Sequence, residues 1–266
     1  MIAKRINQNG RVIVLSDTTD EPITMMGEMA GTCWGADTSD HIKNHKRGND
    51  CIQSEHGRVE EYPQVYLVIS GYSARVMREL YTHIGGAPTR LQESTRYVDC
   101  SSFDYVIPPT VQDNPRTLAA YQDTMRKIAE NIARLEEFGV PREDSAMMLP
   151  LGMTTKVVIR INLRQLIDMS RQRLCNRAYW EFRQLMADII DALSVYSDEW
   201  YDLIKVQRIF KPKCEVLGRC PEKHSCGRYK DNWFRKLENY CYERKISPTS
   251  LDDLLLKLRE YQENGD

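Results

Sequence analysis

The order of strand-like and helix-like segments constrains the fold of this chain most. Runs rich in β-branched and aromatic residues, typical of strands, occur at residues 11–16, at Val65–Ile69 and at residues 154–162. Long segments with apolar residues at helical spacing occupy residues 115–139 and about 163–204, with a break near Cys175 and Asn176. The segments do not alternate as strand, helix and parallel strand. The sequence therefore predicts an α+β fold, with an antiparallel or mixed central sheet flanked by long helices.

Shorter segments are assigned from turn residues and polarity. Gly71 and Ser73 are expected to open a helix that buries its apolar face, and Gly139 is a plausible C-terminal cap of the helix at 115–139. The remaining expectations are a helix beginning within 21–36, a polar loop at 35–50, an extended segment at 102–111 that two prolines end, and an amphipathic helix at 248–263.

Charge and hydropathy exclude several classes of function. The 266 residues carry 37 Lys and Arg against 38 Asp and Glu, so no basic field predicts binding of a nucleic acid polymer. No apolar run approaches the roughly 18 residues of a membrane span, and the N-terminal residues lack a signal-peptide pattern. Eight scattered cysteines are then expected to be reduced thiols. We expect a cytoplasmic protein without a membrane partner.

Three of the cysteines form a denser group near the C-terminus. Cys214, Cys220 and Cys226 enclose His224 and follow the spacing C-x5-C-x5-C. Zinc sites usually contain a closer pair such as C-x2-C. We therefore predict no metal here and favour a loop whose cysteines pack, although metal binding stays open on the sequence alone.

The stretch THIGGAPTRLQESTRY, residues 82–97, is the strongest candidate for a binding site. Gly85, Gly86 and a proline exclude a regular helix through it. If the following QESTRY is extended, Gln92, Ser94 and Arg96 point to one side and offer an amide, a hydroxyl and a guanidinium. That set suits a phosphate or a planar heterocycle. Polar alternation is equally ordinary in a half-exposed edge strand.

These residues resemble the signature of the flavin-dependent thymidylate synthases, which reads R-H-R, seven residues, then S, ending in N-[EQ]-x-S-x-R-Y. The QESTRY core fits, whereas Thr82 and Ile84 stand where the two arginines of R-H-R are expected and two extra residues precede Ser94. A second block, from Leu149 to Phe182, is similar to the family's second conserved block. Its matching positions are Leu149, Pro150, Leu151, Asn162, Arg164, Arg173, Trp180 and Glu181.

A third segment, CIQSEHGRVEEY, is similar to the family's C-x2-S-x-H…E segment, and the resemblance spans about residues 10–205. Two departures concern charge. Ala146 stands where the family has an arginine, and Arg58 stands where it has a serine near the flavin. The resemblance implies a catalytic domain over residues 1–207 with the family's fold, followed by a cysteine-bearing extension over 208–266.

The resemblance also implies the reaction: reductive methylation of dUMP to dTMP, with methylenetetrahydrofolate as carbon donor and NADPH-reduced FAD as hydride source. It implies a homotetramer whose sites are shared between subunits. Arg173 becomes the expected catalytic residue, because it aligns with the arginine that polarises the uracil ring. The expected dUMP contacts are Arg78, Glu79, Gln92, Ser94, Arg96 and Arg173. The expected FAD contacts are Arg58, His83, Asn162, Arg164 and Asp168.

Two other functions remain open. A pyrimidine nucleotide C5-hydroxymethylase on the same scaffold would use the same folate but water in place of the hydride, and the altered R-H-R and Ala146 leave room for it. A non-catalytic protein that binds a nucleotide or a metal through the Cys214–Cys226 segment is the alternative from another class.

Overall fold

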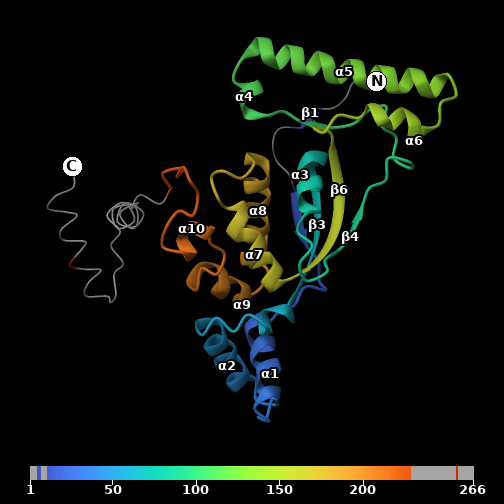
Figure 1. Ribbon diagram of the computed structural model, residues 1–266. Coiled ribbons are helices and arrows are strands. Elements are labelled where there is room, and N and C mark those ends of the chain that lie inside the picture. The colour runs from blue at the N-terminus through green and yellow to red at the C-terminus, as the bar shows by residue number, and fades with distance from the viewer. Residues whose placement is uncertain (1–4, 7–10, 229–255, 257–266) are drawn as a thin grey trace.

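The computed structural model describes residues 5–6, 11–228 and 256, and Figure 1 shows how their helices and strands are arranged. The strands are β1 Arg5–Ile6, β2 Arg11–Val14, β3 Gln64–Ser73, β4 Thr89–Gln92, β5 Tyr105–Val106 and β6 Thr154–Asn162. The α-helices of the first half are α1 Pro22–Cys33, α2 His41–Gln53, α3 Ala74–Leu80, α4 Pro109–Gln112 and α5 Pro115–Glu137. Those of the second half are α6 Arg142–Ser145, α7 Leu163–Arg173, α8 Trp180–Ser194, α9 Asp198–Tyr201 and α10 Lys213–Val216. Shorter turns are η1 Val59–Glu61, η2 Ala146–Met148 and the π-helical η3 Asp202–Val206.

The central sheet is antiparallel and has the strand order β2-β3-β6-β4. On one face, alternate residues such as Val65 and Leu67 of β3 and Ile159 of β6 are almost fully buried. Helices α7 and α8 cover that face (Figure 1). On the other face, Val158 and Arg160 of β6 are exposed. A one-sided antiparallel sheet covered by helices confirms the predicted α+β class.

A second, smaller core lies at the far end of β6. Helix α5 runs across that end (Figure 1) and buries Met125, Ala129 and Ile132 against Phe103 and Tyr105. The predicted helix at 115–139 is confirmed, and Gly139 follows it with a φ of 83°, the left-handed backbone expected just after a helix end.

The polar segment at 35–50 is not the loop that its composition predicts. It contains α2, which Asp40 begins by accepting a hydrogen bond from the Lys43 backbone N–H, 3.1 Å. Helix α2 packs backbone against backbone on α1. A Cβ on Gly27 would lie 1.8 Å from the Asn44 carbonyl oxygen, and one on Gly48 would lie 1.9 Å from the Ile23 carbonyl oxygen. A helix that docks through glycine needs few apolar side chains, so periodicity did not reveal it.

Two other expectations need adjustment. Ser73 does open α3, because its side chain accepts from the Val76 N–H, but Gly71 lies inside β3 at a bulge with a φ of 77°. Around the predicted break, α7 ends at Arg173 and α8 begins at Trp180. The helix expected at 248–263 falls outside the described residues apart from Leu256. No helix within the described ranges is long and apolar enough to cross a membrane.

Candidate active site

A cavity of about 520 Å³ lies where β6 ends and α7 begins, beside the turn that follows α3. Four of the five residues predicted to contact FAD line it, namely His83, Asn162, Arg164 and Asp168. They come from segments some 80 residues apart in the chain, so the fold itself assembles them. The other lining residues are Glu61, Thr82, Ile84, Gly85, Gly86, Gln165 and Gln172.

Asn162 joins the sheet to this cavity. It is the last residue of β6 and the N-terminal cap of α7, and its Oδ1 accepts from the Gln165 N–H at 2.9 Å. Only 8% of its surface is exposed. Gly86 lies directly against it, since a Cβ on that glycine would be 2.7 Å from Asn162 Nδ2. The capping role fixes Oδ1 and leaves the amide N–H₂ as the group that borders the cavity.

Two charged residues on α7 border the same cavity. The Arg164 guanidinium donates to Glu61 Oε1 at 2.8 Å, and both side chains are about half exposed. Asp168, one turn further along α7, accepts from the Arg171 guanidinium at 2.9 Å. These exposed ion pairs contribute little stability, so their partners can be exchanged for a ligand at small cost.

Arg173 is the centre of a tighter cluster beside the cavity. Its Nε donates to His83 Nε2 at 2.9 Å, and its Nη1 donates to Glu79 Oε2 at 2.7 Å. The guanidinium also stacks over the Phe182 ring, 4.3 Å from the centroid, and the side chain is only 17% exposed. The residue predicted to be catalytic is thus a partly buried cation that three side chains hold in one orientation.

His83 is held neutral in this cluster. Burial, and then the charges of Arg173 and Arg90, lower the pKa of His83 from 6.5 to about 4. A neutral imidazole is required for its Nε2 to accept the hydrogen bond from Arg173. The backbone carbonyl of His83 accepts in turn from the Arg90 guanidinium and from Gln165 Nε2, the latter at 3.2 Å.

Gln165 is a site residue that the sequence analysis missed. It is 6% exposed, its Nε2 is bonded to His83, and its Oε1 is buried without a partner. A buried amide oxygen left without a donor is costly, and this residue lines the cavity. The available signal was its position three residues after the capping Asn162, which places it in the first turn of α7.

The nucleotide-binding residues predicted from QESTRY do not line the 520 Å³ cavity. Strand β4 ends at Gln92, and a turn follows in which the Tyr97 N–H donates to the Ser94 carbonyl at 3.1 Å. The prediction that Gln92, Ser94 and Arg96 point to one side required QESTRY to be extended. The segment is extended only as far as Gln92, so that prediction is wrong for Ser94 and Arg96. Arg96 instead pairs with Glu143, at 2.8 Å.

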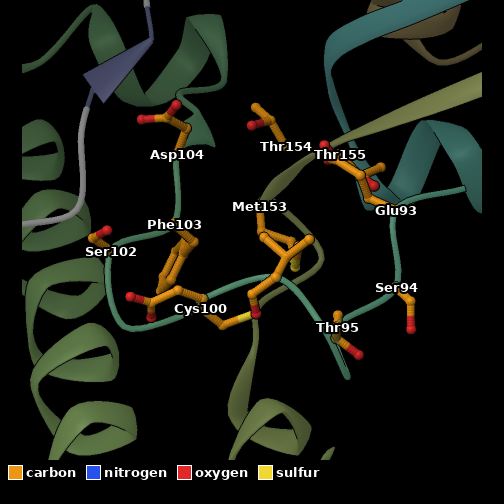
Figure 2. Close-up of a pocket in the computed structure, with 12 residues that line it drawn as sticks. Glu93, Ser94, Thr95, Cys100, Ser102, Phe103, Asp104, Met153, Thr154 and Thr155 are labelled. Carbon is orange, nitrogen blue, oxygen red and sulfur yellow. The ribbon is translucent and has the colours of Figure 1, made fainter. Parts of the chain in front are cut away.

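Ser94 lines a second, smaller cavity of about 170 Å³. Figure 2 shows its walls, with Glu93, Ser94, Thr95 and Thr155 on one side, Cys100, Ser102, Phe103 and Asp104 on the other, and Met153 and Thr154 between them. Gln92 is near this end of the sheet, because its Nε2 donates to the Thr155 hydroxyl at 3.3 Å.

Arg58 and Arg78 are site candidates that line neither of these two cavities. Both are exposed, and neither lines the 520 Å³ cavity. Arg78 belongs to α3, one residue before Glu79, whereas Arg58 immediately precedes η1. Their predicted contacts with dUMP and FAD remain predictions.

The fold and the site together define an α+β protein with a polar ligand cavity at the start of α7. A family model described as "Thymidylate synthase complementing protein" matches residues 14–195. A flavin-dependent thymidylate synthase from Nitratidesulfovibrio vulgaris is 30% identical over 79% of this chain and 92% of its own length. One from Thermococcus kodakarensis is 31% identical over 63% of this chain and 68% of its own length. The chain belongs to the flavin-dependent thymidylate synthases, a family of enzymes.

Solved structures agree on the fold at low sequence identity. The UMP/dUMP methylase PolB from Streptomyces cacaoi, bound with 5-Br dUMP, has a TM-score of 0.64 at 14% identity. The match covers 76% of this chain and 96% of the PolB chain. Thymidylate synthase X from Helicobacter pylori, with FAD and dUMP, has a TM-score of 0.54 at 19% identity, over 71% of this chain and 96% of its own. The expected fold is confirmed, and family membership sets the non-catalytic alternative aside.

Proposed function

We propose that this chain catalyses the reductive methylation of dUMP to dTMP, with methylenetetrahydrofolate as carbon donor and FAD, reduced by NADPH, as hydride source. The observation that carries the proposal is Arg173. This arginine donates to Glu79 and to His83, and His83 lines the cavity that gathers four of the expected flavin contacts.

Arg173 supplies a fixed positive charge. Methyl transfer to the C5 atom of uracil develops negative charge on the ring, and a preorganised cation lowers the free energy of that transition state. The side chain is 17% exposed, so water screens its charge less than it screens a surface arginine. Glu79 and His83 keep the guanidinium in place.

The cavity residues fit a flavin. Gln165 Oε1 is a buried acceptor that lacks a donor, and flavin rings offer an N–H group. Asn162 provides amide donors, and Arg164 provides a cation for a phosphate. When bound there, FAD would supply the hydride that completes the methyl group. The chain's own residues would bind it, orient it and exclude water from one side.

We propose further that the enzyme is a homotetramer with shared sites. Ser94 and Arg96 lie outside the cavity that holds His83 and Asn162 within one chain. The segment 91–97, exposed except at the half-buried Ser94 and Thr95, would complete the dUMP site of another subunit, together with Arg78 and Glu79. The cytoplasm, where NADPH and folate are available, is the proposed location. Residues 1–207 form the proposed catalytic domain and 208–266 its extension.

One observation favours a second candidate, the C5-hydroxymethylase. Thr82 and Ile84 line the 520 Å³ cavity, which we call the flavin-side cavity, at the positions where the family signature has arginines. A site with fewer positive charges would hold the reduced cofactor differently and admit water to the one-carbon intermediate.

Product analysis tests both candidates. The purified protein is incubated anaerobically with dUMP, methylenetetrahydrofolate and NADPH, and the nucleotide products are identified by mass spectrometry. The proposal expects dTMP at a rate that depends on added FAD. Hydroxymethyl-dUMP as the main product would establish the second candidate, and unchanged dUMP would refute both.

A further inference from the structure

A third cavity, of about 410 Å³, separates the α7–α8 loop from the segment 213–228. Arg173 lines it, Gln172 lines both it and the 520 Å³ cavity, and four cysteines face it, namely Cys175, Cys214, Cys220 and Cys226. Cys175 comes from the loop between the two helices, and the other three come from the C-x5-C-x5-C segment. The sequence motif alone offered three thiols without a close pair. The fold adds a fourth from a distant part of the chain.

Specific contacts hold the segment on the loop. The Arg177 guanidinium donates to the His224 carbonyl at 3.2 Å and pairs with Glu222, also at 3.2 Å. Arg228 bonds the Leu174 carbonyl and pairs with Glu215 at 3.3 Å. The C-terminal part of the segment is thus fixed to residues that adjoin Cys175, and the Arg228–Glu215 pair ties the first part of the segment to it.

The charge around the cavity suits an anionic centre. Five basic residues and one acidic residue, Glu222, line it, and the basic ones are Arg171, Arg173, Arg177, Lys213 and Arg228. Cys214 and Cys220 are each 7% exposed. Metal binding releases the proton of a thiol and leaves a bound thiolate. Four metal-bound thiolates would carry net negative charge, which this basic lining would offset.

We propose that Cys175, Cys214, Cys220 and Cys226 together ligate a thiolate-bound metal centre. Four cysteine ligands select zinc or an iron–sulfur cluster. A single zinc ion needs all four sulfurs about 2.3 Å from one point. Within the described part of the chain, no group of three or more His, Cys, Asp or Glu side chains is arranged to hold one ion as it stands. The four cysteines line one cavity of about 410 Å³, so we expect the larger occupant that four thiolates hold, an iron–sulfur cluster.

Such a centre would act on the reaction site through the backbone. Cys175 lies two residues beyond Arg173, at the start of the loop that ends α7. A metal bond to Cys175 would fix the loop that directly follows the proposed catalytic arginine. The other three ligands would come from residues 213–228, which lie outside the part of the chain that the family model matches.

Metal analysis of the whole protein tests this proposal. The chain is purified anaerobically, and iron, acid-labile sulfide and zinc are measured per chain. The matched variants are Cys175→Ser and Cys226→Ser, and the control is Cys33→Ser, an exposed cysteine at the end of α1. Cys226 is also exposed, so its replacement removes a ligand without leaving a hole in a core.

The expected result is about four iron and four sulfide per chain, falling at least fivefold in both cavity variants and unchanged in Cys33→Ser. Stoichiometric zinc with the same dependence on the cysteines would also support the site, occupied by a single ion. Apoprotein treated anaerobically with Fe²⁺ and sulfide, or separately with Zn²⁺, gives a second measurement. Absence of both metals after both treatments, or metal content that survives both variants, would overturn the proposal. Circular dichroism checks that each variant is folded.

Discussion

Replacing Gly86 with alanine should damage the flavin-side cavity far more than replacing its neighbour Gly85. Gly86 has a φ of 68°, in the left-handed region that alanine disfavours, and its added Cβ would lie 2.7 Å from Asn162 Nδ2. Gly85 has open space around the position of a Cβ and no such backbone angle. The two glycines are adjacent in the same turn and both line the cavity, so each is a control for the other.

The expected magnitude follows from two separate costs. A left-handed backbone costs a non-glycine residue roughly 1–2 kcal/mol. Moving the Asn162 side chain away from the new methyl group would loosen the cap on α7, and losing such a cap costs about 1 kcal/mol. The sum predicts that Gly86→Ala lowers the free energy of unfolding by about 2–3 kcal/mol. Gly85→Ala should change it by no more than about 0.5 kcal/mol.

The displaced Asn162 amide should also weaken cofactor binding. We expect the FAD dissociation constant to rise more than tenfold in Gly86→Ala, a loss of over about 1.4 kcal/mol, and to stay within twofold of wild type in Gly85→Ala. FAD titration by fluorescence quenching measures the affinity, at a urea concentration where both variants are fully folded. If Gly86→Ala is destabilised but binds FAD as the wild type does, then the glycine only turns the chain. The proposed contact between Asn162 and the flavin would be refuted.

Three other variants test the remaining roles. Arg173→Ala should lower kcat by about a hundredfold or more, roughly 3 kcal/mol of barrier, while FAD stays bound; the exposed Arg160→Ala is the control, and unchanged turnover in Arg173→Ala would exclude the catalytic role. If Ser94 positions the nucleotide, Ser94→Ala should raise the activation free energy by about 1–2 kcal/mol. Complete loss of turnover with normal dUMP binding would instead indicate a serine nucleophile. Folding lowers the pKa of His83 from 6.5 to about 4, so between these pH values the unfolded chain carries a proton on His83 that the folded chain lacks. The free energy of unfolding should therefore fall as the pH drops from 6.5 toward 4. His83→Gln should flatten that slope in urea unfolding series, and an equal slope in both proteins would argue against the neutral histidine.

Strong periodicity made the long elements predictable. The strand at 154–162 and the helix at 115–139 follow from β-branched alternation and helical spacing, which report burial directly. The helix at 41–53 did not follow, because its contact with α1 uses Gly27 and Gly48 rather than apolar side chains. Polarity was mistaken for exposure. Similarly, nothing in the sequence marks where β4 stops and the turn at Ser94 begins.

The candidate site divides in the same way. His83, Asn162, Arg164 and Asp168 were identified by resemblance, and the structure brings them to one cavity. The hydrogen bond between Arg173 and His83 could not be predicted, since it joins two segments 90 positions apart and depends on a neutral imidazole. Gln165 was missed because its importance lies in an unpaired oxygen, which only a three-dimensional arrangement reveals.

The close contact between α1 and α2 has a consequence for how this chain tolerates change. Helix α2 is mostly polar and looks permissive, yet Gly27 and Gly48 leave no space for even one methyl group between the two backbones. The least replaceable positions of the pair are therefore those without a side chain. A library of random substitutions across α2 should show free variation at its exposed charges, interrupted by a glycine that admits no other residue.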